Sequence, residues 1–424
     1  NVILDTGSSD FWLVDNNCTS TECTQVNTFA ANVSSSSSST ARDFTIRYGM
    51  GSASGQLWND TVSLGGHELD NQTVALCDEV SGTLLGGNAS GIMGLGFPRL
   101  SVTGGAPFWL NLMESNDTDL DFEGFSFYFT RYINATNASD TEYGGYFTLG
   151  TLLNETYTGE INYVDVPEGT ESYWVVPMAA ITLNGTNITD LGTPNVAIDS
   201  GTTLIGGPSQ VVENFYESIG GAYALDQEYE GYYTYPCDSI LNISFTFGNE
   251  TYPMTADDLN LGVFNSATNQ CLGAFFDLTL SSGSAAVISW VIGGAFLKNV
   301  YSVYRYNPGP SVGFANLSPS IIASSSRGTG SPPANPSDGH FVSGVFGGPT
   351  LPANGSTITG SPLDGSITPT STPAAAAPAV NSLVPTSLAG GAGRAKHLLF
   401  AEETGKALAL FGLLWMSIWT LGLH

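Results

Sequence analysis

Positive charge is scarce in this chain. Its 424 residues include 10 lysines and arginines against 38 aspartates and glutamates, a formal net charge of −28 at pH 7. Such a surface repels nucleic acid and anionic lipid headgroups, so we expect no nucleic-acid partner. Carboxylate protonation reduces the self-repulsion at low pH, which favours an acid-adapted protein; an acidic secreted protein without a preferred pH is the alternative. The length allows two or three domains.

Histidine and cysteine are also scarce, with four and five residues. The histidines are scattered and no Cys/His cluster has metal-ligand spacing, so we expect no metal and no cofactor. The glycine-rich residues 49–55 lie in an expected hairpin without a following helix, which argues against a phosphate-binding loop. The histidines are His67, His340, His397 and His424.

One motif occurs twice. Apolar residues 2–4 lead into Asp5, followed by Thr-Gly-Ser-Ser, and apolar residues 196–198 lead into Asp199, followed by Ser-Gly-Thr-Thr. An apolar run of this kind is typical of a buried strand, where a lone carboxylate is costly. One copy alone would be consistent with a capping Asp in a turn. Two copies, 194 residues apart, predict two similar lobes that each bring one Asp to a shared cleft.

These motifs resemble those of the pepsin-like aspartic peptidases, and the resemblance covers residues 1–318. It includes a hairpin tip that begins at Tyr48, 43 residues after Asp5, and hydrophobic-hydrophobic-Gly loops at residues 92–94 and 291–293. The resemblance implies an all-β fold of two pepsin-like lobes with a few short helices. We expect an N-terminal lobe at residues 1–160 and a C-terminal lobe at 161–318. The family usually carries a strand before the first Asp, so we expect this sequence to be N-terminally truncated.

The rest of the chain has a different composition. Residues 319–393 are rich in Ser, Thr, Pro and Gly, which predicts a disordered and O-glycosylated stalk. Residues 394–424 combine a spacer with an uncharged apolar end, a layout typical of a GPI-attachment signal after a small-residue site. A short transmembrane anchor is the alternative. We expect a monomer of a fungal, GPI-anchored type, on the outer face of the plasma membrane or in the cell wall.

Local patterns predict several elements. Residues 44–64 alternate around a glycine-rich tip as a hairpin does. Residues 106–115 and 208–219 have helical periodicity with a proline near the start of each. The serine tract at residues 34–40 is interpreted as a surface insertion with little order.

Asn-x-Ser/Thr sequons are dense, which argues for passage through the secretory pathway. The resemblance and an oxidising compartment imply the disulfides Cys18–Cys23 and Cys237–Cys271 and leave Cys77 over. The sequons begin at Asn17, Asn32, Asn59, Asn71, Asn88, Asn116, Asn134, Asn137, Asn154, Asn184, Asn187, Asn242, Asn249, Asn316 and Asn354.

Asp5 and Asp199 are the candidate catalytic residues. Two facing carboxylates share one proton over an acidic range, so one can act as general base on a water while the other donates to the scissile carbonyl oxygen. We therefore expect an aspartic endopeptidase that acts on proteins or peptides.

The resemblance assigns supporting roles. Thr6 and Ser200 would interlock the two loops, and Ser8 and Thr202 would bond the outer carboxylate oxygens. Tyr48 would close over substrate and bond to Trp12. The substrate pocket would comprise Ile3, Tyr48, Gly49, Met50, Ile92 and Gly201. Apolar Met50, where many fungal relatives have an acid, predicts hydrophobic residues on either side of the cut.

Some positions depart from the family pattern. Ser90 and Gly294 stand where acids are common, and Arg305 follows Tyr304 where an acid often follows. These changes would remove negative charge near the second Asp. They leave open the alternative of a catalytically weak or inactive pepsin-fold glycoprotein of the cell wall, whereas the intact Asp5, Asp199, Tyr48, Trp12 and Gly94 favour the active peptidase. A two-carboxylate glycosidase also needs paired acids, but does not explain the repeated motif.

Overall fold

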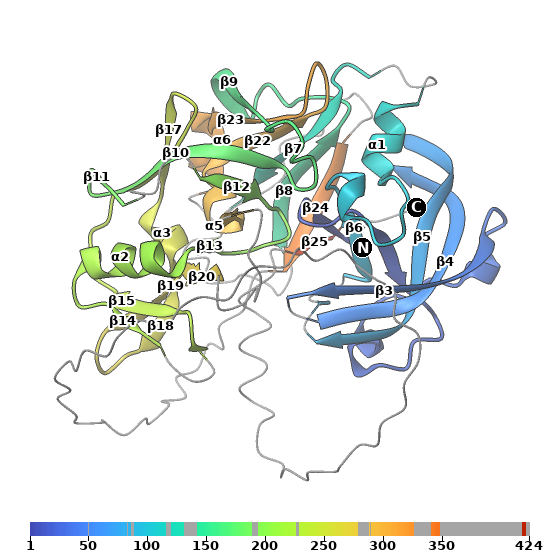
Figure 1. The fold of residues 1–424 in the computed structure, drawn as a ribbon, viewed down its shortest axis with the longest axis horizontal. Coiled ribbons are helices and arrows are strands. Elements are labelled where there is room, and N and C mark those ends of the chain that lie inside the picture. Colours follow the sequence, from blue (N-terminus) through green and yellow to red (C-terminus); the bar gives the residue numbers. More distant parts are fainter. Residues whose placement is uncertain are drawn as a thin grey trace, which may run out of the picture.

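The chain folds into two β-rich halves joined by a shared sheet (Figure 1). The blue strands of the first lobe lie at the right of the view and the yellow-green strands of the second at the left. The computed structural model describes residues 1–49, 51–82, 84–85, 89–115, 120–130, 142–188, 194–225, 229–278, 288, 290–325, 341–347 and 418–420. The all-β bilobal prediction is confirmed.

The first lobe contains a six-stranded sheet in the order β1-β6-β2-β5-β4-β3. The predicted hairpin is present as β3 and β4. β1 runs parallel to β6, which places Asp5 opposite Gly94. A β-carbon on Gly94 would lie 2.4 Å from the Ser9 carbonyl carbon, so only glycine permits this crossing. The strands are β1 (Ile3–Asp5), β2 (Phe11–Val14), β3 (Ser38–Tyr48), β4 (Gly51–Leu64), β5 (His67–Gly82) and β6 (Gly91–Gly94), with 3-10 turns η1 (Thr21–Gln25), η2 (Ala31–Val33) and η3 (Pro98–Leu100).

The second lobe repeats this crossing. β12 runs parallel to β21 with Ile198 opposite Ile292, and a β-carbon on Gly293 would lie 2.1 Å from the Thr202 carbonyl oxygen. The main sheet has the order β17-β16-β10-β12-β21-β13-β20, with β11 paired to β10, and a smaller sheet has the order β14-β15-β19-β18. The elements are β10 (Val175–Leu183), β11 (Thr186–Asn187), β12 (Asn195–Ile198), β13 (Ile205–Gly207), β14 (Tyr223–Ala224), β15 (Tyr233–Pro236), β16 (Ile243–Phe247), β17 (Glu250–Met254), β18 (Asn260–Asn265), β19 (Gln270–Gly273), β20 (Phe275–Asp277) and β21 (Trp290–Ile292), with α3 (Ala256–Leu259) and α5 (Gly294–Leu297).

A third sheet takes strands from both halves, in the order β25-β24-β8-β7-β22-β23-β9. One hydrophobic cluster contains Leu4 of the first lobe, Ile198 of the second and Phe125 of this shared sheet, so the lobes share a core. The expected lobe boundary near residue 160 lies inside β9 of this sheet. The strands are β7 (Gly124–Phe129), β8 (Glu142–Leu149), β9 (Tyr157–Asp165), β22 (Val300–Arg305), β23 (Ser311–Leu317), β24 (Phe341–Gly347) and β25 (Ile418–Thr420).

Both predicted helices are present. α1 (Phe108–Met113) follows Pro107 and α2 (Ser209–Ile219) follows Pro208. Each proline occupies the N-cap, where its fixed φ is tolerated and its missing N–H costs nothing. In α2 the apolar residues recur at helical spacing, so Val211 and Phe215 face the core.

One expectation needs correction. The serine tract at residues 34–40 is ordered, because the Ser34 and Ser36 hydroxyls donate to Asp60 Oδ1 at 2.8 and 2.5 Å and β3 begins at Ser38. Within the expected stalk and tail, the structure describes three short elements, α6 (Pro319–Ser325), β24 and β25. β24 pairs with the otherwise free edge of β8, since such an edge presents unpaired backbone groups. Over the described ranges, none of the helices is long and apolar enough to span a membrane.

Both predicted disulfides are confirmed. Cys18 is joined to Cys23, and Cys237 to Cys271. Cys77 is a buried free thiol, and burial raises its pKa well above the usual range. That environment favours the neutral thiol, so Cys77 acts as a small core residue.

Candidate functional site

The two motif aspartates meet between the lobes. Asp5 ends β1 and Asp199 follows β12, and the glycine two residues after each Asp lies against the opposite carboxyl group. A β-carbon on Gly201 would lie 2.1 Å from Asp5 Oδ1 and 3.3 Å from Asp199 Oδ1. One on Gly7 would lie 2.7 Å from both Asp199 oxygens. The carboxyl groups are therefore within a few ångströms of each other, and glycine is required because the opposite carboxylate fills the side-chain space.

Each carboxylate accepts the same pair of hydrogen bonds. Ser8 Oγ donates to Asp5 Oδ2 at 2.5 Å and Thr202 Oγ1 donates to Asp199 Oδ2 at 2.6 Å. The Gly7 and Gly201 amides donate to the respective Oδ1 atoms, both at 2.8 Å. Two donors hold each carboxylate in one orientation, which preorganises the pair. The geometry expected for Ser8 and Thr202 is thus present.

Thr6 and Ser200 bind the two loops together reciprocally. The Thr6 amide donates to Ser200 Oγ at 3.0 Å and the Ser200 amide donates to Thr6 Oγ1 at 2.9 Å. The hydroxyls in turn donate to Ile198 O at 2.8 Å and Leu4 O at 2.7 Å. All these groups are buried, so each loop depends on the other to satisfy its polar atoms.

The pair holds one proton near neutral pH. Burial and, second to it, the negative charge of Asp199 raise the pKa of Asp5 to about 8, although hydrogen bonds from Ser8 and Gly7 act in the opposite direction. A second negative charge in this buried site is unfavourable. The arrangement therefore provides a proton donor beside a carboxylate acceptor.

A cavity of about 150 Å³ opens beside the pair. Five of the six predicted pocket residues line this cavity. Trp12 Nε1 donates a hydrogen bond to Tyr48 Oη at 2.9 Å, as expected. Met50, the sixth predicted residue, lies outside the described residues. The cavity is lined by Ile3, Asp5, Gly7, Tyr48, Gly49, Leu84, Ile92, Asp199, Gly201 and Thr202.

Sequence reasoning missed two residues here. Leu84 lines the cavity, and no local motif distinguished it from other apolar residues near a strand end. Tyr173 is within electrostatic reach of the pair: burial and then the charges of Asp199 and Asp5 raise its pKa. The sequence signal that could have indicated Tyr173 is its place directly before Trp174, a buried residue at the start of the second lobe.

The departures from the family pattern have different consequences. Arg305 stacks on the Tyr163 ring at 3.8 Å and donates to Ser311 Oγ, on the face of β22 opposite Tyr304. Successive residues of a strand face opposite ways, so the Arg305 charge points away from the face of β22 that carries Tyr304. Ser90 Oγ is buried without a hydrogen-bond partner among the described residues. The Gly294 amide donates to Thr202 O at 2.8 Å and starts α5.

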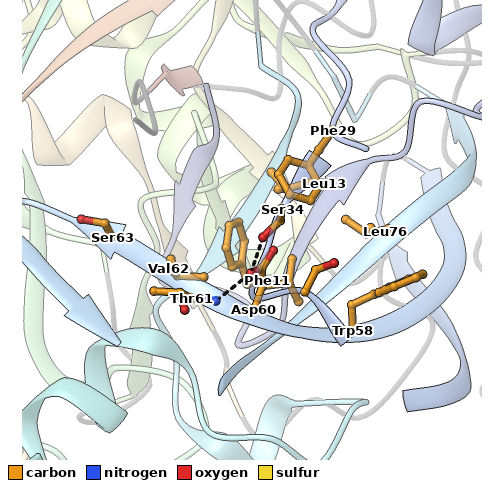
Figure 2. A pocket seen from close by; sticks show the side chains of 12 residues that line it. Phe11, Leu13, Phe29, Ser34, Trp58, Asp60, Thr61, Val62, Ser63 and Leu76 are labelled. Carbon is orange, nitrogen blue, oxygen red and sulfur yellow. Dashed lines mark hydrogen bonds between the residues drawn. The ribbon is translucent and has the colours of Figure 1, made fainter. Parts of the chain in front are cut away.

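A second cavity, of about 240 Å³, lies on the first sheet (Figure 2). Its walls are mostly apolar, with Phe11 and Trp58 among them, and Asp60 is the one titratable side chain among its lining residues. Asp60 Oδ1 accepts hydrogen bonds from Ser34, Ser36 and the Thr61 amide. This carboxylate organises a turn and has no acidic partner in the cavity, so the first cavity is the candidate active site.

Two β-rich lobes that place a hydrogen-bonded carboxylate pair in a shared cleft define an aspartic-peptidase site. The sequence profile described as eukaryotic aspartyl protease matches residues 1–317. The chain belongs to this family and is an aspartic endopeptidase that acts on peptide substrates. Membership sets aside the glycosidase alternative.

Three relatives illustrate the range of similarity. The chain is 39% identical over 339 residues to major aspartyl peptidase 1 of Cryptococcus neoformans var. grubii serotype A, covering 78% of this chain and 68% of the relative. It is 32% identical over 320 residues to cathepsin D of Chionodraco hamatus, covering 74% and 76%. It is 31% identical over 307 residues to pepsin A of Sus scrofa, covering 72% and 74%.

Proposed function

We propose that Asp5 and Asp199 cleave peptide bonds by activating a water held between them. Asp199 takes a proton from the water while the water oxygen attacks the carbonyl carbon. Asp5 gives its own proton to the carbonyl oxygen. The resulting diol collapses when Asp199 passes its proton to the amide nitrogen, the C–N bond breaks and a diol hydroxyl returns a proton to Asp5, leaving a carboxylic acid and an amine. The geometry of the pair carries the proposal, because two carboxyl groups within a few ångströms of each other, each held by two donors, place a proton donor beside a base. The raised pKa of Asp5 agrees with a proton held by the pair.

The reaction is proposed to run at acidic pH. The one-proton state of the pair requires Asp199 to be ionised and Asp5 protonated, and the latter is satisfied below about pH 8. The net charge of −28 adds a reason for low pH, because it destabilises the compact state most when all carboxylates are ionised.

The specificity is proposed to be hydrophobic. Ile3, Ile92 and Leu84 present apolar walls beside the carboxylate pair, and burying an apolar side chain against them is favourable while a lysine would lose hydration there. Cleavage of a peptide library should therefore be dominated by sites with aliphatic or aromatic residues. Dominant cleavage at Lys or Arg would contradict this.

The protein is further proposed to be a secreted, N-glycosylated monomer tethered at the cell surface, without a nucleic-acid partner. Its exposed sequons support this, because glycosylation requires accessible asparagines. Release of the protein from cells by phosphoinositide-specific phospholipase C would distinguish a GPI anchor from a transmembrane tail. Among described sequon residues, Asn59 is half-buried and the exposed ones are Asn17, Asn32, Asn71, Asn154, Asn184, Asn187, Asn242, Asn249 and Asn316.

The deciding experiment measures hydrolysis of a denatured protein from pH 2 to 7 by wild type, Asp199→Asn and Asp60→Asn. Asp199→Asn removes the proposed base and should lower kcat by at least about a thousandfold while the fold, followed by circular dichroism, persists. Asp60→Asn alters a buried carboxylate outside the site and should keep activity. A folded wild type that is inactive at every pH would favour the cell-wall glycoprotein instead.

A further inference from the structure

We propose that Trp174 is a positioning residue that holds the carboxylate pair in register by linking the Asp-bearing strands of the two lobes. The proposal rests on the function proposed for Asp5 and Asp199. Trp174 lies just before β10, makes no contact with the cavity and is fully buried. Its role would be exerted entirely through other residues.

Three hydrogen bonds form the link. The Leu95 amide donates to Asp5 O at 2.7 Å, and Trp174 Nε1 donates to Leu95 O at 2.8 Å. The Ile198 amide donates to Trp174 O at 3.0 Å. Trp174 therefore connects the backbone of Asp5 in the first lobe with the residue that precedes Asp199 in the second.

The indole ring is fixed by aromatic neighbours from the first lobe and the shared sheet. Its ring centroid lies 4.4 Å from that of Phe97, 5.3 Å from Trp109, 5.5 Å from Phe125 and 5.4 Å from Tyr304. A buried side chain packed on several sides has one accessible rotamer, so the direction of its N–H is set. The link is therefore rigid at both ends.

This link acts at a different place from the Thr6–Ser200 interlock. The interlock joins the loops beside the carboxylates, whereas Trp174 joins the strands behind them. Attachments at separate places restrict rotation of one strand relative to the other. The Phe97 amide, which donates to Ser172 O at 3.0 Å, is a further attachment on the rear side, so the Trp174 bond is one part of this restraint. Loss of the Trp174 bond should let the carboxylates move apart without unfolding either lobe.

Trp109 offers a matched control. Its Nε1 donates to Gly96 O at 3.0 Å, one residue along from Leu95, and it is also fully buried in the same aromatic cluster. Trp109 and Gly96 both belong to the first lobe. Replacing either tryptophan by Phe removes one buried N–H donor and leaves a carbonyl unpaired, but only Trp174→Phe removes a bond between lobes.

The measurable consequence is the proton affinity of the pair. Part of the rise in the pKa of Asp5 comes from the charge of Asp199, which weakens as the groups separate. Trp174→Phe should therefore lower the upper pKa of the pair by about half a unit or more. Both substitutions keep the other titratable residues near the pair, of which only Tyr304 packs on the Trp174 ring. These residues are Tyr48, Asp10, Tyr173 and Tyr304.

The test compares full-length wild type, Trp174→Phe and Trp109→Phe by two readouts. The first is the pH dependence of kcat/KM, whose basic limb reports the upper pKa. The second needs no turnover and follows the ¹⁵N-labelled amides of Gly7 and Gly201 through a pH titration, because these amides donate to the two carboxylates. We expect the basic limb and the Gly7 midpoint to move to lower pH in Trp174→Phe alone, with kcat reduced about tenfold and KM nearly unchanged.

Several outcomes would overturn the proposal. An unchanged Gly7 midpoint in Trp174→Phe, or equal shifts in both variants, would show that Trp174 only stabilises the core. An inactive wild type with a normal Gly7 titration would contradict the proposed function, while the Gly7 comparison would still decide the role of Trp174. If Trp174→Phe does not fold, 3-benzothienylalanine at position 174 removes the donor and keeps the ring shape.

Discussion

The Thr6 amide donates to Ser200 Oγ and the Ser200 amide donates to Thr6 Oγ1, so two residues 194 positions apart satisfy each other's buried groups. The relationship is symmetric in the motif and in space. It means that neither carboxylate loop is complete in an isolated lobe. The pair of aspartates is consequently a property of the assembled halves.

Thr6→Val should be strongly destabilising. The substitution keeps the shape but leaves the Ser200 amide and Ile198 O unpaired, and each buried unpaired group costs about 1–3 kcal/mol. We expect the free energy of unfolding to fall by roughly 2–5 kcal/mol and kcat to fall at least tenfold. Urea denaturation and peptide hydrolysis measure the two effects. Thr6→Ser keeps the hydroxyl and should stay close to wild type; equal losses in both variants would contradict the role of the hydroxyl.

Gly201→Ala should lower the rate of hydrolysis by about a hundredfold or more while most of the fold survives. Its new β-carbon would meet Asp5 Oδ1 at 2.1 Å, so the Asp5 carboxylate must move. Displacement of a reacting group by about 1 Å costs on the order of a hundredfold in rate. The control is Gly309→Ala, where nothing lies within 4 Å of the added carbon. Full activity in Gly201→Ala, measured with the same peptide, would mean that Asp5 does not take part.

Tyr304→Phe should leave stability unchanged or raise it by about 1 kcal/mol. Tyr304 Oη is buried and has no hydrogen-bond partner within standard distance and angle limits among the residues that the structure describes. Burial raises its pKa, and the nearby Ser302 and Thr6 hydroxyls act in the opposite direction. Removing an unpaired buried hydroxyl relieves a desolvation cost.

Tyr301→Phe is the matched comparison for Tyr304→Phe. Tyr301 Oη is hydrogen-bonded to Ser126 Oγ at 2.6 Å and accepts a hydrogen bond from the Leu153 amide at 3.0 Å. Loss of this hydroxyl should therefore lower the free energy of unfolding by about 1–3 kcal/mol. Thermal unfolding compares both variants with wild type. A reversed order would show that Tyr304 has a partner and Tyr301 does not need one.

Asp5→Asn should flatten the pH dependence of stability. An unfolded Asp loses its proton near pH 4, but the folded chain keeps the Asp5 proton up to about pH 8. The folded state binds more protons between these values, so the contribution of Asp5 to the unfolding free energy is full below pH 4. It is lost as pH rises through this window, with a slope of up to about 1.4 kcal/mol per pH unit.

Urea denaturation of both proteins at a series of pH values measures this effect. The remaining acidic residues contribute similarly to both chains, so the difference between their slopes isolates Asp5. Parallel curves for wild type and Asp5→Asn would contradict the raised pKa.

Local patterns were sufficient to predict two helices and one hairpin. The prolines at 107 and 208 and the helical spacing behind them placed α1 and α2 to within two residues, and the glycine-rich tip located the hairpin of β3 and β4. The serine tract misled, because composition alone favoured disorder. Its order depends on Asp60, a residue more than twenty positions away.

The sequence by itself determined the carboxylate pair, since a repeated acid-hydroxyl-glycine motif after an apolar strand has few other physical uses. It also determined both disulfides through the resemblance that those motifs carry. Only the tertiary structure decided the direction of the Arg305 charge, the approach of Tyr173 and the link through Trp174. These depend on which strand faces meet across the lobes, and such contacts between distant residues leave no periodic signal in the chain.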